Sequence, residues 1–138
     1  MDIRKDYSGA KKTIYRLVLG TGSNETSPAV EFLRQLKVSN PKSHKQMVLR
    51  YQRHANNGPS PNEKHERHIS GNLFEFKTNY GDRLLYFNHT ENRTVLISGF
   101  HSGHNIQAQT HYQNAASLRD QYLAEEEQRG STGRRGHS

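Results

Sequence analysis

Residues 73–100, LFEFKTNYGDRLLYFNHTENRTVLISGF, form the stretch from which the fold is predicted. Aromatic and polar side chains alternate along residues 73–80, which is the pattern of a strand with one buried face. Gly81 and Asp82 predict a tight hairpin turn into a partner strand at 83–89. A third strand is expected at 93–100, where apolar residues follow a second polar turn. The stretch therefore predicts a three-stranded antiparallel meander that carries basic side chains.

Four more elements are expected around this meander. Residues 13–19 are mostly apolar and predict a strand. Ser27-Pro28 and Asn40-Pro41 each place a capping side chain before a proline, which predicts two helices in an antiparallel hairpin. Helical spacing of apolar residues predicts a last helix at 106–127. The order β-α-α-β-β-β-α indicates an α+β fold, with helices packed on a small, mostly antiparallel sheet.

The ends of the chain look less regular than its middle. Residues 1–12 are polar and are expected to be a flexible lead-in, so the domain is expected at 13–127. Residues 128–138 contain mainly Gly, Ser, Thr, Arg and His, which predicts a disordered basic tail. Residues 56–72 predict a long loop, and loops of this length tend to be functional or disordered.

Charge and composition narrow the possible partners. Lys and Arg number 20 against 13 Asp and Glu, and the resulting net charge of +7 favours a polyanionic partner such as nucleic acid. The chain has no cysteine, which excludes disulfides and thiolate chemistry. No apolar run approaches the roughly 18 residues that cross a bilayer, and none resembles a signal peptide. We therefore expect a cytoplasmic protein with no membrane partner.

Three segments carry a resemblance to a known family. They are HISGNLFEFK at 68–77, RLLYF at 83–87 and VLISGF at 95–100. Together they resemble the RelE/HigB superfamily, in particular its phage-derived and HigB-like branch, over roughly residues 13–125. The expected order of elements is also that of the family.

The resemblance implies the toxin of a type II toxin–antitoxin pair. Such toxins are endoribonucleases that cut mRNA, usually on the ribosome, and a small antitoxin silences them. The implied partners are therefore mRNA, the ribosome and a small antitoxin, expected to be a helix-turn-helix protein. The related ParE branch inhibits DNA gyrase instead, so the fold alone leaves the function open. The alternative is a non-catalytic binder of gyrase or another host machine, or an RNA-binding module that uses the basic tail.

RNA cleavage without a metal has three chemical requirements. The 2′-hydroxyl loses its proton, the charge on the phosphorane is stabilised, and the leaving 5′-oxygen is protonated. Lys77 and Arg83 match basic strand positions of the family. We expect Arg83 to clamp phosphate with its planar fork and Lys77 to contact the backbone or stabilise charge. Tyr86 is expected to stack a base or carry a proton. His101 and His104, which follow Gly-Phe where relatives often carry lysines, are acid–base candidates.

The predicted loop at 56–72 supplies further RNA contacts. The residues expected to bind RNA there are Lys64, His65, Arg67 and His68; the two histidines are acid–base candidates as well.

Plain structural interpretations of the strand residues stay open. Lys77 and Arg83 are also compatible with solvated strand positions, and Tyr86 with the core. The His-x-x-His pairs at 65/68 and 101/104 raise a zinc site, but neither has a clear carboxylate ligand beside it. No metal and no cofactor are therefore expected.

Overall fold

The computed structural model describes residues 1–103 and 107–136, the last six as backbone alone. Its elements in chain order are β1 (Asp2–Ser8), β2 (Thr13–Val18), the short 3-10 helix η1 (Gly22–Asn24), α1 (Pro28–Ser39), α2 (Pro41–Asn57), β3 (Glu66–Ser70), β4 (Leu73–Lys77), β5 (Asp82–Thr90), β6 (Arg93–His101) and α3 (Ala108–Gly136). The strands form one sheet in the order β1-β2-β6-β5-β4-β3. Among the strands of the described residues, only β2 and β6 pair in parallel. The α+β class is confirmed.

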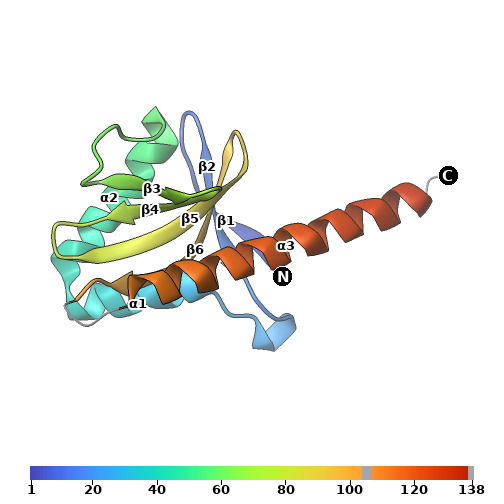
Figure 1. The fold of residues 1–138 in the computed structure, drawn as a ribbon, viewed down its shortest axis with the longest axis horizontal. Coiled ribbons are helices and arrows are strands. Elements are labelled where there is room, and N and C mark those ends of the chain that lie inside the picture. Colours follow the sequence, from blue (N-terminus) through green and yellow to red (C-terminus); the bar gives the residue numbers. More distant parts are fainter. Residues whose placement is uncertain (104–106, 137–138) are drawn as a thin grey trace.

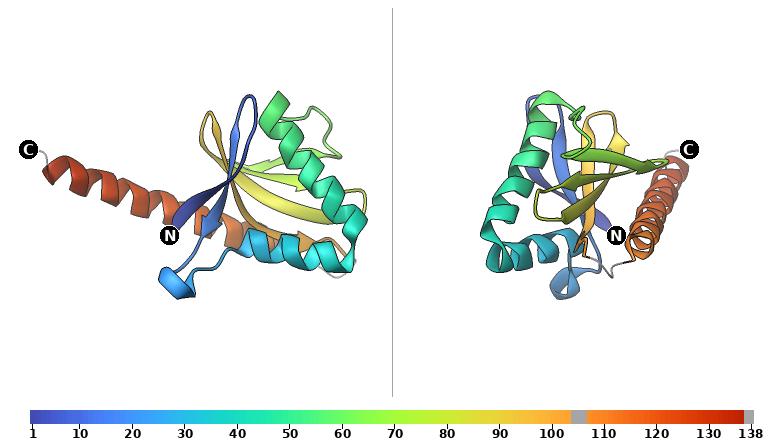
Figure 2. Two further views of the ribbon diagram at one scale, coloured as in Figure 1. Left: turned by 180° about the vertical axis from the view of Figure 1, so that it is seen from behind. Right: turned by 60° about the vertical axis from the view of Figure 1, so that its left-hand side comes forward.

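Helices cover both faces of this mixed sheet, with α1 and α2 on one side and α3 on the other (Figures 1 and 2). Ile14, Phe76, Leu84, Tyr86 and Leu96 belong to the core under α1 and α2. Leu17, Leu85, Phe87, Val95 and Ile97 belong to the core under α3. Because neighbouring strand residues point to opposite faces, these two clusters show to which helical layer each side chain belongs.

The predicted meander is present as the consecutive neighbours β4, β5 and β6. Lys77 lies opposite Arg83, and Asp82 lies opposite His101. The first predicted strand ends three residues earlier than expected, because residues 78–81 form the turn. Gly81 has φ +87°, a conformation that favours glycine.

The two predicted helix starts are confirmed, but the antiparallel hairpin is not. Ser27 Oγ accepts a hydrogen bond from Val30 N at 3.5 Å, and Asn40 Oδ1 accepts one from Ser43 N at 3.1 Å. Asn40 is both the C-cap of α1 and the N-cap of α2. A single connecting residue leaves no loop in which to reverse direction, so the helices meet at a corner (Figure 2).

The expected flexible lead-in at residues 1–12 is wrong, because β1 pairs with β2 along the sheet edge. A β-bulge between Lys5 and Tyr7 changes the face to which the strand's side chains point. Ile3 therefore packs on the α3 side, whereas Tyr7 packs on the side of α1 and α2. The other residues of β1 are polar, so the sequence alone does not reveal this strand.

The expected loop at 56–72 is also wrong in part. The helix α2 continues to Asn57, and β3 pairs with β4 as the other edge strand. Its first residue, Glu66, is buried and accepts hydrogen bonds inside the protein. The sequence of β3, ERHIS, lacks apolar alternation because its buried position is a glutamate, Glu66, and Ile69 is its single apolar residue.

The expected disordered tail at 128–138 is contradicted up to residue 136, because α3 continues to Gly136. The far half of the helix extends beyond the sheet (Figure 1). The Met1 ammonium contacts Glu125 Oε2 at 2.9 Å, and Arg129 Nη1 donates to Met1 O at 3.3 Å, so the residue before β1 contacts this part of the helix. Within residues 1–103 and 107–136, no helix has the length and apolar character of a membrane span.

Candidate functional site

A fully buried carboxylate is the centre of the candidate site. Glu75 of β4 is 0% exposed. Its Oε1 lies 2.5 Å from Arg83 Nη1 and 3.0 Å from Arg67 Nη2. Its Oε2 accepts a hydrogen bond of 2.9 Å from the Tyr112 hydroxyl. A buried carboxylate is costly unless it is paired and hydrogen-bonded, and these three side chains meet that need.

Strand register brings these groups together. Arg67 on β3 lies directly opposite Glu75 on β4, and Lys77, two residues beyond Glu75, lies opposite Arg83 on β5. Residues two apart on a strand share a face, so Glu75 and Lys77 both face α3. Tyr112 reaches down from the start of α3 and also accepts hydrogen bonds from Arg67 at 3.2 Å and Arg83 at 3.3 Å. We call Arg67, Glu75, Lys77, Arg83 and Tyr112 the Glu75 cluster.

The Glu75 cluster carries more positive than negative charge. Its three cations face one carboxylate, which leaves a surplus of two positive charges. Burial lowers the pKa of Lys77, and the nearby charges of Arg83 and Arg67 lower it further. Arg83 Nε is buried and has no hydrogen-bond partner among the described residues. The cluster therefore has the electrostatics of an anion-binding surface, and its lysine is less basic than an isolated one.

A second polar arrangement lies at the same end of the sheet. Asp82 is 3% exposed, and its Oδ1 lies 2.9 Å from His101 Nδ1. Its Oδ2 accepts a hydrogen bond of 2.5 Å from Ser43 Oγ of α2, and Ser43 also contacts Thr78 at 2.7 Å. The His101 side chain is 61% exposed. A carboxylate that holds Nδ1 orients the ring and favours the tautomer in which Nε2 accepts a proton.

The structure divides the predicted catalytic residues between the two faces. Lys77 and Arg83 lie together on the α3 side, in the Glu75 cluster. His101 lies toward α2, because its partner Asp82 is bonded to Ser43 of that helix. His104 lies outside the described residues. The expected single constellation of strand cations and histidines is therefore not formed in the described part of the chain.

Tyr86 differs most from its expected role. It is 2% exposed and stacks on Phe76 at 4.4 Å and on Phe74 at 5.2 Å between ring centroids. Burial raises its pKa well above the ordinary value of a tyrosine. Tyr86 is a core residue that keeps its proton at neutral pH, and it is not part of the Glu75 cluster.

The predicted RNA-binding residues also separate. Arg67 joins the Glu75 cluster, whereas His68, the next residue, points to the other face, where its ring lies tilted against Phe74 with centroids 4.9 Å apart. Lys64 is exposed in the connection before β3. His65 follows it, and its carbonyl accepts a hydrogen bond from Lys77 N at 2.8 Å. Burial is the largest cause of a lowered pKa at His65.

Sequence reasoning missed Glu75, Tyr112 and Asp82. Glu75 resembled an ordinary polar strand residue, and Asp82 an ordinary turn residue. Tyr112 shares an apolar stripe with the rest of the last helix, so its hydroxyl gave no signal. One pattern does point to Glu75: it lies two residues before Lys77, on the face that also carries Arg83.

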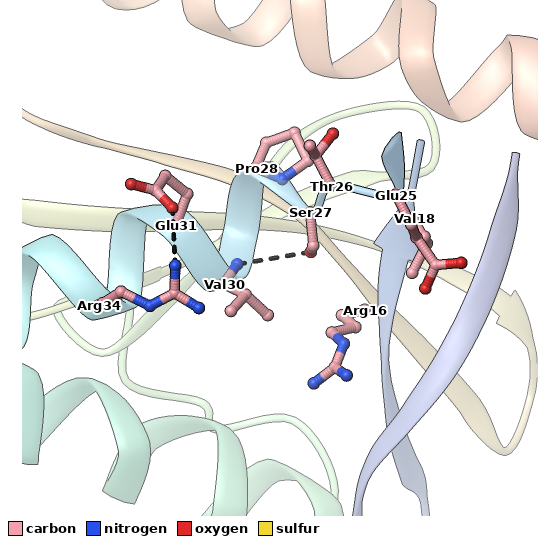
Figure 3. A pocket seen from close by; sticks show the side chains of 9 residues that line it. All are labelled: Arg16, Val18, Glu25, Thr26, Ser27, Pro28, Val30, Glu31 and Arg34. Carbon is pink, nitrogen blue, oxygen red and sulfur yellow. Dashed lines mark hydrogen bonds and ion pairs between the residues drawn. The ribbon is translucent and has the colours of Figure 1, made fainter. Parts of the chain in front are cut away.

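A pocket of about 620 Å³ lies away from the Glu75 cluster, between β2 and the start of α1 (Figure 3). Its lining mixes two arginines, Arg16 and Arg34, with two glutamates, Glu25 and Glu31. Arg34 is already paired with Glu31 at 3.1 Å. The pocket contains none of the predicted site residues, and its balanced charge does not favour a polyanion.

The fold and the Glu75 cluster together define a small α+β domain with a cationic surface on three adjacent strands. The sequence matches no protein-family model, and a search of curated proteins finds no significant match. Among residues 1–103 and 107–136, no group of three or more His, Asp or Glu side chains is arranged to hold a metal ion.

Proposed function

We propose that the chain is a toxin of the RelE/HigB type that cuts mRNA without a metal. In this proposal it acts in the cytoplasm, associates with the ribosome, arrests translation and is silenced by a small antitoxin. The observation that carries the proposal is the surplus of positive charge at the Glu75 cluster. Three cations on adjacent strands attract a polyanion more strongly than a single exposed lysine does.

The chemistry is assigned to side chains as follows. Arg67 and Arg83 bind the scissile phosphate and stabilise the phosphorane, because their guanidinium groups are already oriented by Glu75 and Tyr112. The proton of the 2′-hydroxyl passes to the neutral form of Lys77, which the lowered pKa makes more populated than in an unperturbed lysine. The 2′-oxygen then bonds to phosphorus, and the bond from phosphorus to the 5′-oxygen breaks.

The leaving 5′-oxygen needs a proton from a second group. The proposal leaves this step to a water molecule, because His101, the acid expected from the sequence, faces α2 on the other side of the sheet. His101 lies one residue beyond the Arg83–Phe100 pair, toward the other face. This step is therefore tested separately from phosphate binding.

The experiment compares Arg83→Lys and Arg83→Ala with wild type, using primer extension on mRNA from induced cells. Arg83→Lys keeps the charge but loses the fork, so it is informative even where Arg83→Ala destabilises the fold. We expect cleavage to fall by about 10²-fold or more in both. Arg34→Ala, in an exposed pair on α1, is the matched control and should cleave like wild type. Growth arrest with intact transcripts would sink the nuclease proposal.

A second candidate function is a non-catalytic binder of the same fold, acting on gyrase or another host machine. The separation of His101 from Lys77 and Arg83 favours it, because binding needs no acid and base on one surface. This second function predicts toxicity without RNA cleavage, and it predicts that His101→Ala leaves the toxicity unchanged. An RNA-binding module that uses the basic end of α3 would instead lose binding on truncation after residue 127. A neighbouring reading frame that encodes a small helix-turn-helix protein would favour the toxin proposal.

A further inference from the structure

A second pocket lies on the opposite face from the Glu75 cluster, between the α2–β3 connection and strands β3, β4 and β5. Its volume is about 270 Å³, and its lining residues include Pro59, Ser60, His68, Phe74, Tyr86 and Asn88. The connection that forms its outer wall is anchored, because Ser60 N donates to the buried Glu66 Oε2 at 2.5 Å. Two prolines in that wall, Pro59 and Pro61, stiffen it further.

Flat rings dominate one side of this pocket. Phe74 and Tyr86 are stacked, with ring planes 16° apart. His68 lies over Phe74 at 46°, and its Nε2 is held by a contact of 2.7 Å with the carbonyl of Gly71. Phe74 is only partly buried and His68 is exposed, so these two fixed rings suit a planar heteroaromatic ligand, which stacks on them without ordering any side chain.

One buried acceptor in the pocket is unused. Asn88 Oδ1 is buried and has no hydrogen-bond partner in the described part of the chain. The backbone of Asn88 is satisfied, since its N–H donates to Asn72 Oδ1 at 2.9 Å and its carbonyl accepts from Asn72 Nδ2 at 2.7 Å. The side-chain oxygen therefore has an unmet need for a donor, which a ligand with an N–H group would satisfy.

Charge around the pocket argues against a phosphate inside it. Glu63 and Glu66 both line it, and their carboxylates repel an anion. A neutral ring with an amino group avoids this repulsion, donates a hydrogen bond to Asn88 Oδ1 and stacks on Phe74.

Arg67 lines this pocket and also belongs to the Glu75 cluster. Since β3 is an edge strand, a polynucleotide can pass around it from one face to the other.

We propose that this pocket binds a nucleobase with an exocyclic amino group, from an RNA strand whose phosphates lie on the Glu75 cluster. The inference rests on the proposed function for its ligand, but it concerns a different face and different residues. It makes Asn88 a specificity-determining residue. His68, expected from the sequence to bind RNA, then acts by stacking.

The test is an NMR titration of the full chain with AMP, UMP and ribose 5-phosphate. AMP has an exocyclic amino group, UMP has none, and ribose 5-phosphate has no base. We expect AMP to shift the signals of Phe74 and Asn88 and to bind roughly tenfold more tightly than UMP. Asn88→Leu should remove that preference. Asn92→Leu, at an exposed turn position outside the pocket, should keep it.

Three outcomes would overturn the inference. These are equal affinity for AMP and UMP, an unchanged preference in Asn88→Leu, and shifts at Phe74 and Asn88 with ribose 5-phosphate. A short oligodeoxyadenylate has no 2′-hydroxyl and cannot be cleaved. It tests whether the pocket binds a base within a nucleic-acid strand as well as a free nucleotide. AMP binding without oligonucleotide binding would overturn the assignment to RNA. Base binding by a chain that cuts no RNA would refute the nuclease proposal and leave the pocket standing, so the two failures are distinguishable.

Discussion

The substitution Glu75→Gln tests whether one buried carboxylate organises the whole Glu75 cluster. The amide has nearly the same shape, but it carries no charge and its NH₂ group faces donors. Its oxygen can occupy one of the two Oε positions and accept there either from the two arginines or from Tyr112. The bonds that are lost are charge-assisted, and each contributes about 1.5–3 kcal/mol.

The expected magnitude follows from exposure. The Arg67 side chain is 40% exposed, so water compensates much of its loss, whereas Arg83 is only 20% exposed. Glu75→Gln should therefore lower the free energy of unfolding by about 2–4 kcal/mol, near the lower part of the range for a broken buried ion pair. Urea denaturation measures the change. Glu31→Gln removes an exposed pair with Arg34 and should change stability by less than about 0.5 kcal/mol.

Added phosphate shows whether the instability of Glu75→Gln comes from the changed charge of the cluster or from lost packing. Without the Glu75 charge, the surplus at the cluster rises from two to three positive charges. This gain in charge should outweigh the weaker orientation of the two arginines, so inorganic phosphate should bind the variant more tightly. At about 100 times its Kd, a ligand stabilises the folded state by about 2.7 kcal/mol. Phosphate should therefore raise the urea midpoint of Glu75→Gln more than that of wild type. Equal increases, or a loss no larger than that of the Glu31→Gln control, would refute the reasoning.

Further predictions concern stability and pH. The folded-state pKa of Lys77 lies below its ordinary value of 10.5. Between these two pKa values the unfolded chain binds more protons than the folded chain, so the free energy of unfolding rises with pH. Lys77→Met should remove that rise, which urea midpoints measured from about pH 8 to 11 would show. Gly99→Ala would put a Cβ 2.2 Å from the Phe32 ring and should cost about 1–3 kcal/mol, with Phe32→Leu restoring part of it. His54→Ala removes the partner 2.5 Å from the buried Glu66 carboxylate and should cost about 3 kcal/mol or more, and a thermal or urea shift worth less than about 1 kcal/mol would contradict this role.

The sequence predicted the elements whose patterns are local. The meander is recognisable because its strands alternate and its turns contain Gly81 or polar residues. Both helix starts are recognisable from capping residues beside prolines. The edge strands β1 and β3 were missed, because each buries only a few side chains and the rest are polar. Edge pairing depends on a partner strand elsewhere in the chain, which periodicity does not reveal.

The candidate site was half predictable for the same reason. Lys77 and Arg83 were found because they lie on neighbouring predicted strands. Tyr112 contacts Glu75 across 37 residues of chain, and no local pattern encodes that contact. His101 was recognised as a candidate, but the face to which it points depends on strand alternation and on its bond to Asp82. Residue type indicates chemistry, whereas strand register decides which groups meet.

The two buried glutamates of this domain differ in a way that bears on function. Glu66 is paired with His54, itself 1% exposed, and its other oxygen accepts from a backbone N–H, so its charge is satisfied inside the core. Glu75 instead holds two arginines, of which Arg67 reaches solvent. Buried ion pairs add little stability over well-packed apolar residues, so stability alone does not account for a cluster with surplus cations. A surface that binds anions does account for it, because a carboxylate that orients two arginines in advance reduces the entropy lost when phosphate binds.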